Sequence, residues 1–314
     1  MRTLLSVALL WIVAILNGQS LMVSGTISDA FTDAPLPYAN IMLVGEAIGT
    51  SSNSSGYFEL FLADSLLNDS IIVSYVGYQK HIFCISDNRP DIIKLKPIRF
   101  KLNEVLVKPL STARKQITLN KFKRRKCFVR HAPINNDSSQ AWIPCRTSEP
   151  TIEALYFPYE EEYAGTRKLK EVVVKVSNYA SPPTYFNLRI FRASENISPG
   201  NDILATPIIV EVNETKNPIV IDLEEYNLTI PENGLFIGFE LLIIDENKSI
   251  IPDKNGSPVL LYSPFLNFFS SKEESVFWIY SKGKWSKSSH SFPLFHKMDR
   301  QKYSRPAISL ILTD

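Results

Sequence analysis

The sequence predicts an all-β protein made of two β-sandwiches in series. Short apolar runs alternate with polar residues at a period of two, and turn-forming Gly, Pro, Asn, Asp and Ser interrupt them every few residues. Between residues 21 and 109 no window has convincing helical periodicity. The chain of 314 residues is also long enough for two domains with separate cores.

Residues 1–20 have the layout of a secretory signal peptide. Arg2 is their one charged residue, an unbroken apolar run covers residues 4–16, and small and polar residues follow. The run is short for a membrane span, and an uncleaved membrane anchor is the alternative. We therefore expect a chain that is secreted across the inner membrane and loses this segment.

Residues 21–109 predict a small antiparallel sandwich. Its strands are expected at residues 22–27, 39–44, 56–61, 70–76, 80–85 and 91–96. The polar stretch 49–56 reads as a turn between strands, because Ser, Asn and Gly bend the backbone and bond to it locally. Phe58 and Leu60 should then share one face of the following strand.

Four short motifs follow one another in this span. They are a glycine early in the first strand with a Pro-Leu-Pro turn, a Gly-Thr turn ending in glycine before an aromatic residue, a Gly-Tyr strand, and a closing Leu-x-Glu-Val strand. The residues that form these four motifs are Gly25, Pro35, Leu36, Pro37, Gly49, Thr50, Gly56, Phe58, Gly77, Tyr78, Leu102, Glu104 and Val105. With these motifs, residues 21–109 resemble the carboxypeptidase regulatory-like domain family.

The resemblance implies a transthyretin-like (prealbumin-like) sandwich of seven or eight strands, an accessory module without chemistry of its own. Where the family often has Thr-Asp in the glycine turn, this chain has Ser52 and Asn53, which can make the same side-chain to backbone hydrogen bonds. In secreted proteins of Gram-negative bacteria the domain occurs in cell-envelope proteins. The resemblance therefore places the chain in the periplasm or at the outer-membrane surface.

A basic linker is expected at residues 110–140. Its charge is concentrated at Lys121, Lys123, Arg124, Arg125 and Lys126. A short helix could form here, with Ile117, Leu119 and Phe122 as its apolar positions. A solvated linker face is the interpretation we prefer, and peripheral contact with anionic lipid or lipopolysaccharide is the alternative.

Three cysteines would enter an oxidising compartment, and their odd number leaves at least one of them unpaired. Cys127 and Cys145 flank a polar loop and could form a disulfide that closes it. Two buried thiols are the alternative. Cys84 lies in an apolar alternation and is expected in a core.

Residues 141–314 predict a larger β-sandwich. Ten strands are expected at residues 141–145, 151–157, 170–177, 185–193, 206–212, 218–225, 234–244, 258–263, 274–281 and 306–313. Polar loops join them, which is typical of a two-sheet jelly roll. Residues 186–204 carry an Arg-x-aromatic strand before a Pro-Gly loop, and residues 219–242 an Asp-Leu strand, a Pro-x-x-Gly turn and a Gly-x-Glu strand. In these features the segment resembles bacterial envelope jelly rolls and carbohydrate-binding modules.

The sequence offers no strong motif for catalysis or for a cofactor. The signatures HExxH, His-x-x-Glu, Gly-x-Ser-x-Gly and GxxxxGK[ST] are all absent. The weaker groupings are Cys127, His131 and Cys145 as zinc ligands, Cys145 with His290 or His296 as nucleophile and base, and the oxygen-rich loop at residues 245–256 as a calcium site. We prefer a structural role for each, so no metal, cofactor or hydrolase activity is expected.

Aromatic residues supply the one candidate ligand site. Residues 275–290 read as a hairpin that brings Trp278, Tyr280, Trp285 and Lys284 to one end of the second sandwich. Aromatic faces stack on sugar rings, and a neighbouring lysine can donate hydrogen bonds to sugar hydroxyls. The alternative, which we prefer for Trp278 or Tyr280, is that the side chain belongs to the core.

The charge of the chain bears on the class of partner. The chain has 34 basic and 32 acidic side chains, and this near-neutral balance argues against nucleic acid. We therefore expect a secreted, non-catalytic cell-envelope protein that binds a glycan or an envelope partner. The alternative is a structural adaptor that uses the first domain and the basic linker to dock a larger periplasmic or outer-membrane complex.

Overall fold

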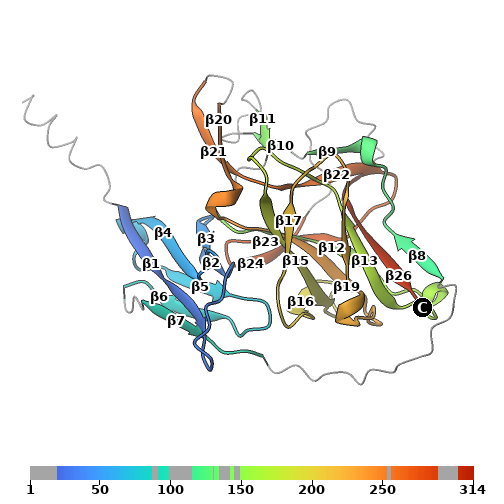
Figure 1. The fold of residues 1–314 in the computed structure, drawn as a ribbon, viewed down its shortest axis with the longest axis horizontal. Helices are drawn as coiled ribbons and strands as arrows, with labels where there is room; N and C mark the ends of the chain where they lie inside the picture. Colours follow the sequence, from blue (N-terminus) through green and yellow to red (C-terminus); the bar gives the residue numbers. More distant parts are fainter. Residues whose placement is uncertain are drawn as a thin grey trace, which may run out of the picture.

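The computed structural model describes two β-sheet units that lie side by side (Figure 1). The described residues are 20–86, 91–98, 115–129, 131–133, 142–144, 149–252, 256–288 and 303–314. Within them the regular structure consists of strands and short 3-10 helices, which confirms the predicted all-β class. The 3-10 helices are η1 (Asp64–Leu66), η2 (Arg124–Lys126), η4 (Glu161–Tyr163), η5 (Glu224–Tyr226) and η6 (Asp245–Asn247).

The first unit is a sandwich of seven strands. One sheet has the order β4 (Tyr57–Ala63), β1 (Ser20–Asp29), β7 (Ile92–Leu95). The other has the order β3 (Gly49–Ser51), β2 (Asn40–Leu43), β5 (Ser70–Ser74), β6 (His81–Cys84). Ile27, Ile41, Phe58, Ile71 and Ile93 are buried between the sheets. Their burial follows the alternation of the sequence, because successive side chains of a strand point to opposite faces.

Two details of the first unit differ from the sequence expectations. Strand β1 pairs with β4 in antiparallel fashion but with β7 in parallel, so the sandwich is not purely antiparallel. Cys84 lies on the edge strand β6 and is half-buried, so it is not a core residue. The edge of a sheet is more open to solvent than its centre, and the apolar alternation of residues 81–84 does not reveal this position.

The polar stretch 49–56 forms a short strand followed by a tight turn. Gly49 to Ser51 pair with β2, and the turn proper begins after them. Ser52 is fully buried, where its hydroxyl accepts from the Ala39 amide at 2.8 Å and donates to the Leu36 carbonyl at 2.9 Å. The Asn53 side-chain oxygen accepts from the amides of Ser55 and Tyr57. The predicted side-chain to backbone bonds of Ser52 and Asn53 are therefore present.

The second unit is built on one large sheet. Its order is β16 (Pro199–Asp202), β15 (Thr184–Ala193), β19 (Leu235–Leu241), β12 (Ile152–Phe157), β23 (Phe277–Ser281), β24 (Lys284–Lys287), with β17 (Ile208–Val212) also on β15. Two further sheets are β18 (Ile219–Asp222), β13 (Lys168–Val174), β26 (Ile308–Thr313), β8 (Gln116–Leu119), and β14 (Val176–Ser177), β22 (Phe265–Ser271), β25 (Tyr303–Pro306) with β9 (Cys127–Val129). The separate pairs are β10 (His131–Pro133) with β11 (Trp142–Pro144), and β20 (Lys248–Pro252) with β21 (Pro258–Tyr262).

An apolar core lies between the large sheet and the two sheets that face it. Phe186 and Ile237 from the large sheet meet Val172, Phe268 and Leu310 from the opposite side, and all five are buried. This two-layer arrangement agrees in architecture with the predicted sandwich. The strands expected by sequence all have counterparts here, but β8, β9, β10, β16, β20, β22 and β25 are not among the expected strands.

Part of the expected linker belongs to the second unit. The short helix predicted around Ile117 and Leu119 is wrong, because these residues lie in β8, which pairs with β26. Their side chains pack against the core, while Gln116 and Thr118 are exposed. Strand β9 follows and pairs with β22. The basic side chains between the two strands are exposed, as a solvated face requires: Lys121, Lys123, Arg124, Arg125 and Lys126.

The outer face of the large sheet packs against the first unit. Side chains from both units bury one another in a shared cluster of Met42, Ile72, Ile152, Ala154, Phe191, Ala193, Phe236 and Tyr280. The backbones also meet, since the Ser51 amide donates to the Ile243 carbonyl at 3.2 Å and the Ile243 amide donates to the Ser51 hydroxyl at 3.0 Å. The two units therefore contact each other through a buried apolar surface with hydrogen bonds beside it.

Candidate binding pocket between the two units

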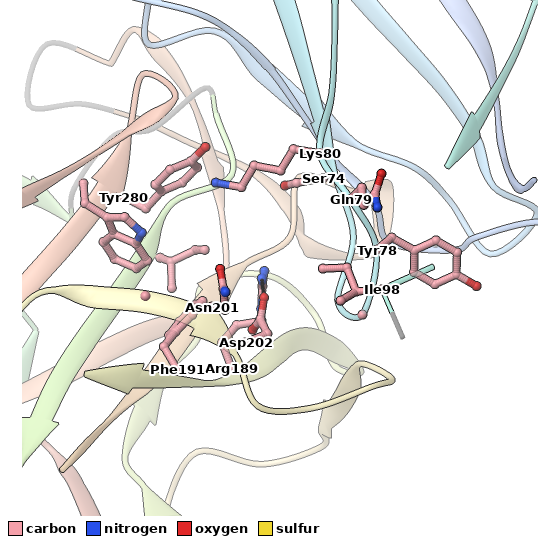
Figure 2. Close-up of a pocket in the computed structure, with 14 residues that line it drawn as sticks. Ser74, Tyr78, Gln79, Lys80, Ile98, Arg189, Phe191, Asn201, Asp202 and Tyr280 are labelled. Carbon is pink, nitrogen blue, oxygen red and sulfur yellow. Dashed lines mark hydrogen bonds and ion pairs between the residues drawn. The ribbon is translucent and has the colours of Figure 1, made fainter. Parts of the chain in front are cut away.

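A pocket of about 450 Å³ opens beside the shared cluster and is lined by both units (Figure 2). The first unit contributes the segment that follows β5, including Gly77 and Lys80. The second unit contributes side chains of β12, β15, β16, β23 and β24. Gly77 has a φ of +80°, and a Cβ atom there would lie 2.1 Å from the Ala205 carbonyl oxygen. Glycine at this position thus lets the first unit approach the second closely.

Charged residues reach the pocket because they occupy the outward positions of a buried strand. In β15, Asn187, Arg189 and Phe191 point away from the core of the second unit, and the residues between them point into it. Glu240 on β19 lies directly opposite Asn187 in the register. The outer face therefore has a polar band, with Asn187, Arg189 and Glu240, beside the apolar shared cluster.

Arg189 is held by two carboxylates. Its Nε and Nη2 donate to the two oxygens of Asp202 at 3.0 and 2.6 Å, and its Nη1 donates to Glu240 at 2.8 Å. Burial alone would lower the pKa of Arg189, but the carboxylates of Asp202 and Glu240 outweigh it and raise the pKa above its ordinary value. The guanidinium is a fixed cation in the pocket wall.

Glu240 connects this ion cluster to the first unit. The residue is 1% exposed, and one of its oxygens accepts from Asn40 of β2 at 3.1 Å. The other oxygen accepts from Asn187 at 2.7 Å as well as from Arg189. Such hydrogen bonds compensate the cost of removing a carboxylate from water. Glu240 lies behind Arg189 and is not part of the pocket lining.

Aromatic side chains form the opposite wall. The Trp285 ring lies 5.3 Å from that of Phe191, edge to face, and 5.2 Å from that of Tyr280. Tyr280 is 3% exposed, and its hydroxyl has no hydrogen-bond partner in the described part of the protein. Burial raises the pKa of Tyr280 to about 12, so the phenol is neutral at physiological pH.

Lys80 extends from the first unit toward this aromatic wall, as Figure 2 shows. Its Nζ lies 5.1 Å from the centroid of the Tyr280 ring, a cation–π distance. Burial of the ammonium, and then the charge of Arg189, lower the pKa of Lys80, whereas Asp202 acts in the opposite direction. Among the described residues the Lys80 ammonium donates no hydrogen bond.

Comparison with known proteins identifies the first of the two units. Residues 23–107 match the family model of the CarboxypepD_reg-like domain. The first unit is a CarboxypepD_reg-like domain. Comparisons of the chain with curated proteins and with solved structures found no match. The assignment therefore covers the first unit, and it agrees with the resemblance that the sequence motifs indicate.

Where the structure describes them, the signature residues of the CarboxypepD_reg-like domain lie at turns and strand contacts. Leu102, Glu104 and Val105 lie outside the described residues. Gly56 has a φ of +77°, and Gly25 lies opposite Phe58 between β1 and β4. A Cβ atom on Gly49 would lie 2.5 Å from the Ile41 carbonyl oxygen. The Tyr78 hydroxyl donates to Asp29 at 2.7 Å. Of these signature residues, Gly77 and Tyr78 also line the pocket.

Only two of the four residues predicted to form the aromatic ligand site line the pocket. The predicted hairpin is present as β23 and β24, and its Tyr280 and Trp285 line the pocket. Trp278 packs against the shared cluster, and its indole nitrogen donates to the Ile197 carbonyl at 3.0 Å. Lys284 is exposed and lies outside the lining. A ligand-binding role for the two lining residues stays a prediction.

Sequence reasoning missed Lys80, Arg189 and Asp202, which supply the charge of the pocket. One signal was available, because Asn187 and Arg189 interrupt the otherwise apolar run of residues 185–191. A polar pair at alternate positions of a buried strand indicates a second, polar contact surface on its outer face. No comparable signal marks Lys80, which lies in a polar segment.

The other predicted groupings are only partly described. Cys145, His290 and His296 lie outside the described residues, so the Cys127–Cys145 disulfide, the zinc set and the nucleophile pairs stay predictions. Cys84 and Cys127 form no disulfide within the described residues. Residues 1–19, with most of the expected signal peptide, are likewise outside. In the described ranges no helix is long and apolar enough to span a membrane, and no three His, Cys, Asp or Glu side chains are grouped for a metal.

The loop considered for calcium is folded around one asparagine. Residues 253–255 lie outside the described structure, but Asn247 is fully buried. Its side-chain oxygen accepts from the Tyr185 amide at 2.7 Å, and its nitrogen donates to the carbonyls of Tyr185 and Leu242 at 2.7 and 2.9 Å. Asn247 therefore joins this loop to β15, and its oxygen is already engaged as an acceptor.

Proposed function

We propose that the protein is a secreted, non-catalytic cell-envelope protein that binds a glycan in the pocket between the CarboxypepD_reg-like domain and the second sandwich. The single observation that carries this proposal is the composition of the pocket. An aromatic wall of Tyr280 and Trp285 faces polar and charged groups that include Lys80, Arg189 and Asp202. Sites for sugars combine these two features, since sugar rings have apolar faces and a rim of hydroxyls.

The size of the pocket also favours a saccharide. A volume of about 450 Å³ is in the usual range for small-molecule sites, and it accommodates one or two sugar rings. Asn201 and Gln79 at its margin are exposed and can exchange hydrogen bonds with sugar hydroxyls. Secretion and the envelope location rest on the signal-peptide layout of residues 1–20.

A glycan array tests this function with residues 21–314 of the chain. We expect the wild-type protein to bind a defined set of glycans and the Trp285→Ala variant to lose that binding. Phe31→Ala is the matched control, because Phe31 is an aromatic residue that is 76% exposed and outside the lining. No binding by the wild type, or equal binding by Trp285→Ala, would contradict the proposal.

A structural adaptor is a second candidate, supported by the outer face of the β4-β1-β7 sheet. Met22 and Phe61 are cross-strand partners there, and they are 47% and 63% exposed. Exposed apolar neighbours of this kind are found at protein contacts. A Phe61→Glu variant that folds normally should then lose an envelope partner that the wild-type and Trp285→Ala proteins both retain.

A further inference from the structure

Lys80 differs from the other charged side chains that line the pocket, because it has no ion-pair partner among the described residues. Arg189 and Asp202, which also line the pocket, pair with each other. Arg189 pairs in addition with Glu240 behind the lining, so two carboxylates compensate its charge. Lys80 has no carboxylate within ion-pairing distance among the described residues. The Lys80 ammonium is therefore the cation of the lining that a ligand can pair with.

Two hydrogen-bond donors without acceptors meet at the same place. The Lys80 Nζ lies 5.1 Å from the centroid of the Tyr280 ring, and both residues line the pocket. The Tyr280 hydroxyl is buried and unpartnered. A buried polar group without a partner costs free energy, and this applies to the Tyr280 hydroxyl. Lys80 is exposed, and its ammonium has three N–H donors and no acceptor. A ligand that satisfies both groups must supply oxygen acceptors.

We propose that the glycan bound by this pocket is an acidic saccharide, whose carboxylate is held by Lys80 of the CarboxypepD_reg-like domain and by the Tyr280 hydroxyl of the second sandwich. This inference rests on the proposed function and specifies its ligand class. A carboxylate pairs with the Lys80 ammonium and accepts from both donors, and these charge-assisted bonds are stronger than bonds between neutral groups. The sugar ring is then placed against Trp285.

The proposal gives the CarboxypepD_reg-like domain a direct part in binding. Lys80 comes from the first unit and Tyr280 from the second, so neither unit alone holds the complete carboxylate site. Gly77 and the shared cluster set the distance between the two groups. The ligand would therefore bridge the two units.

The test compares matched saccharides and matched lysine variants. The probes are oligomers of galacturonic and glucuronic acid beside the corresponding oligomers of galactose and glucose, all on one array and followed by titration calorimetry. We expect the wild-type protein to prefer an acidic oligomer over its neutral counterpart. Lys80→Gln should weaken binding of the acidic oligomer about tenfold or more, because it removes a charge-assisted hydrogen bond.

Lys96→Gln is the control, because Lys96 is an exposed lysine of the same unit outside the pocket lining. Its binding should equal that of the wild type. Equal binding of acidic and neutral oligomers, or a preference that Lys80→Gln leaves intact, would overturn the acidic ligand and leave the proposed glycan function standing. Absence of binding to every saccharide would overturn both.

Discussion

At the scale of single residues, Tyr280 has a buried hydroxyl that the described part of the protein leaves without a partner. Its ring is buried in the shared cluster, yet its hydroxyl has no described hydrogen-bond partner. A phenylalanine would fill the same space without that cost. The presence of a hydroxyl at this position is explained if a ligand oxygen supplies the missing partner.

The Tyr280→Phe substitution separates the effect of the hydroxyl on stability from its proposed effect on saccharide binding. It should raise the free energy of unfolding by about 1 kcal/mol, because it removes a buried unsatisfied hydroxyl, and it should weaken saccharide binding. Tyr156→Phe is the matched control, since the Tyr156 hydroxyl donates to the Asn233 carbonyl at 2.9 Å and its loss should destabilise the protein by about 1 kcal/mol or less. Chemical denaturation measures both changes. A destabilised Tyr280→Phe protein would indicate a structural partner for the hydroxyl.

Asp29 gives the CarboxypepD_reg-like domain a defined sensitivity to acid. The hydrogen bond from Tyr78, followed by the amides of Phe31 and Thr32, lowers the pKa of Asp29 from 3.8 to about 2. A carboxyl group whose pKa is depressed on folding stabilises the protein above its unfolded pKa, and this contribution is lost as the pH falls from 3.8 toward 2.

Tyr78→Phe removes the largest cause of this shift. We expect the variant to lose thermal stability at pH 5 and above, and to show a smaller further loss than the wild type between pH 4 and pH 2. Tyr57→Phe is a suitable control, because the Tyr57 hydroxyl bonds to the exposed Glu59. Parallel curves of melting temperature against pH for Tyr78→Phe and the wild type would contradict the assignment.

At the scale of elements, sequence reasoning finds strands with one buried face, and it also finds long apolar runs such as β19, which is buried on both faces. In β4 the burial alternates along its whole length, and the apolar alternation predicts it. Strand β22 is buried on both faces over Phe265 to Phe269, so it lacks that pattern. Strand β8 has four residues in a basic segment, and its pairing with β26 depends on residues almost 200 positions away. Local periodicity carries no information about such a partner.

The segment around Gly77 is the element that brings the two units together. Gly77→Ala places a Cβ atom 2.1 Å from the Ala205 carbonyl oxygen, in addition to the strain of its φ of +80°. Gly45→Ala is the matched control, since Gly45 has a φ of +91° but no atom within 4 Å of a Cβ. We expect Gly45→Ala to cost about 1 kcal/mol and Gly77→Ala to cost about 1–3 kcal/mol more. Equal losses in denaturation would show that the two units do not meet at Gly77.

At the scale of the whole molecule, the pocket exists because two units dock. Sequence reasoning brings Tyr280 and Trp285 to one end of a sandwich, since both lie on one hairpin. It cannot place Lys80 beside them, because 200 residues separate Lys80 from Tyr280 and no local pattern specifies how one folded unit packs on another. The same limit applies to Asn40 and Glu240, whose bond joins the units.

Glu240→Gln tests this connection. The substitution keeps the shape of the side chain but removes a buried charge that balances Arg189, so it should destabilise the protein by about 3 kcal/mol. Glu273→Gln is the matched control, because Glu273 pairs with Arg305 while its own side chain is 83% exposed, and it should cost less than 1 kcal/mol. Equal effects of the two substitutions on urea denaturation would contradict the role given to Glu240.

The most direct measurement of the central claim is a double-mutant cycle across the two units. The affinity of the acidic oligomer that binds most tightly on the array is measured by titration calorimetry for the wild type, Lys80→Gln, Tyr280→Phe and the double variant. If one carboxylate contacts both side chains, each single change weakens binding and the double variant loses less than the sum of the two free-energy changes. Strictly additive losses, or unchanged affinities, would contradict a site shared by the CarboxypepD_reg-like domain and the second sandwich.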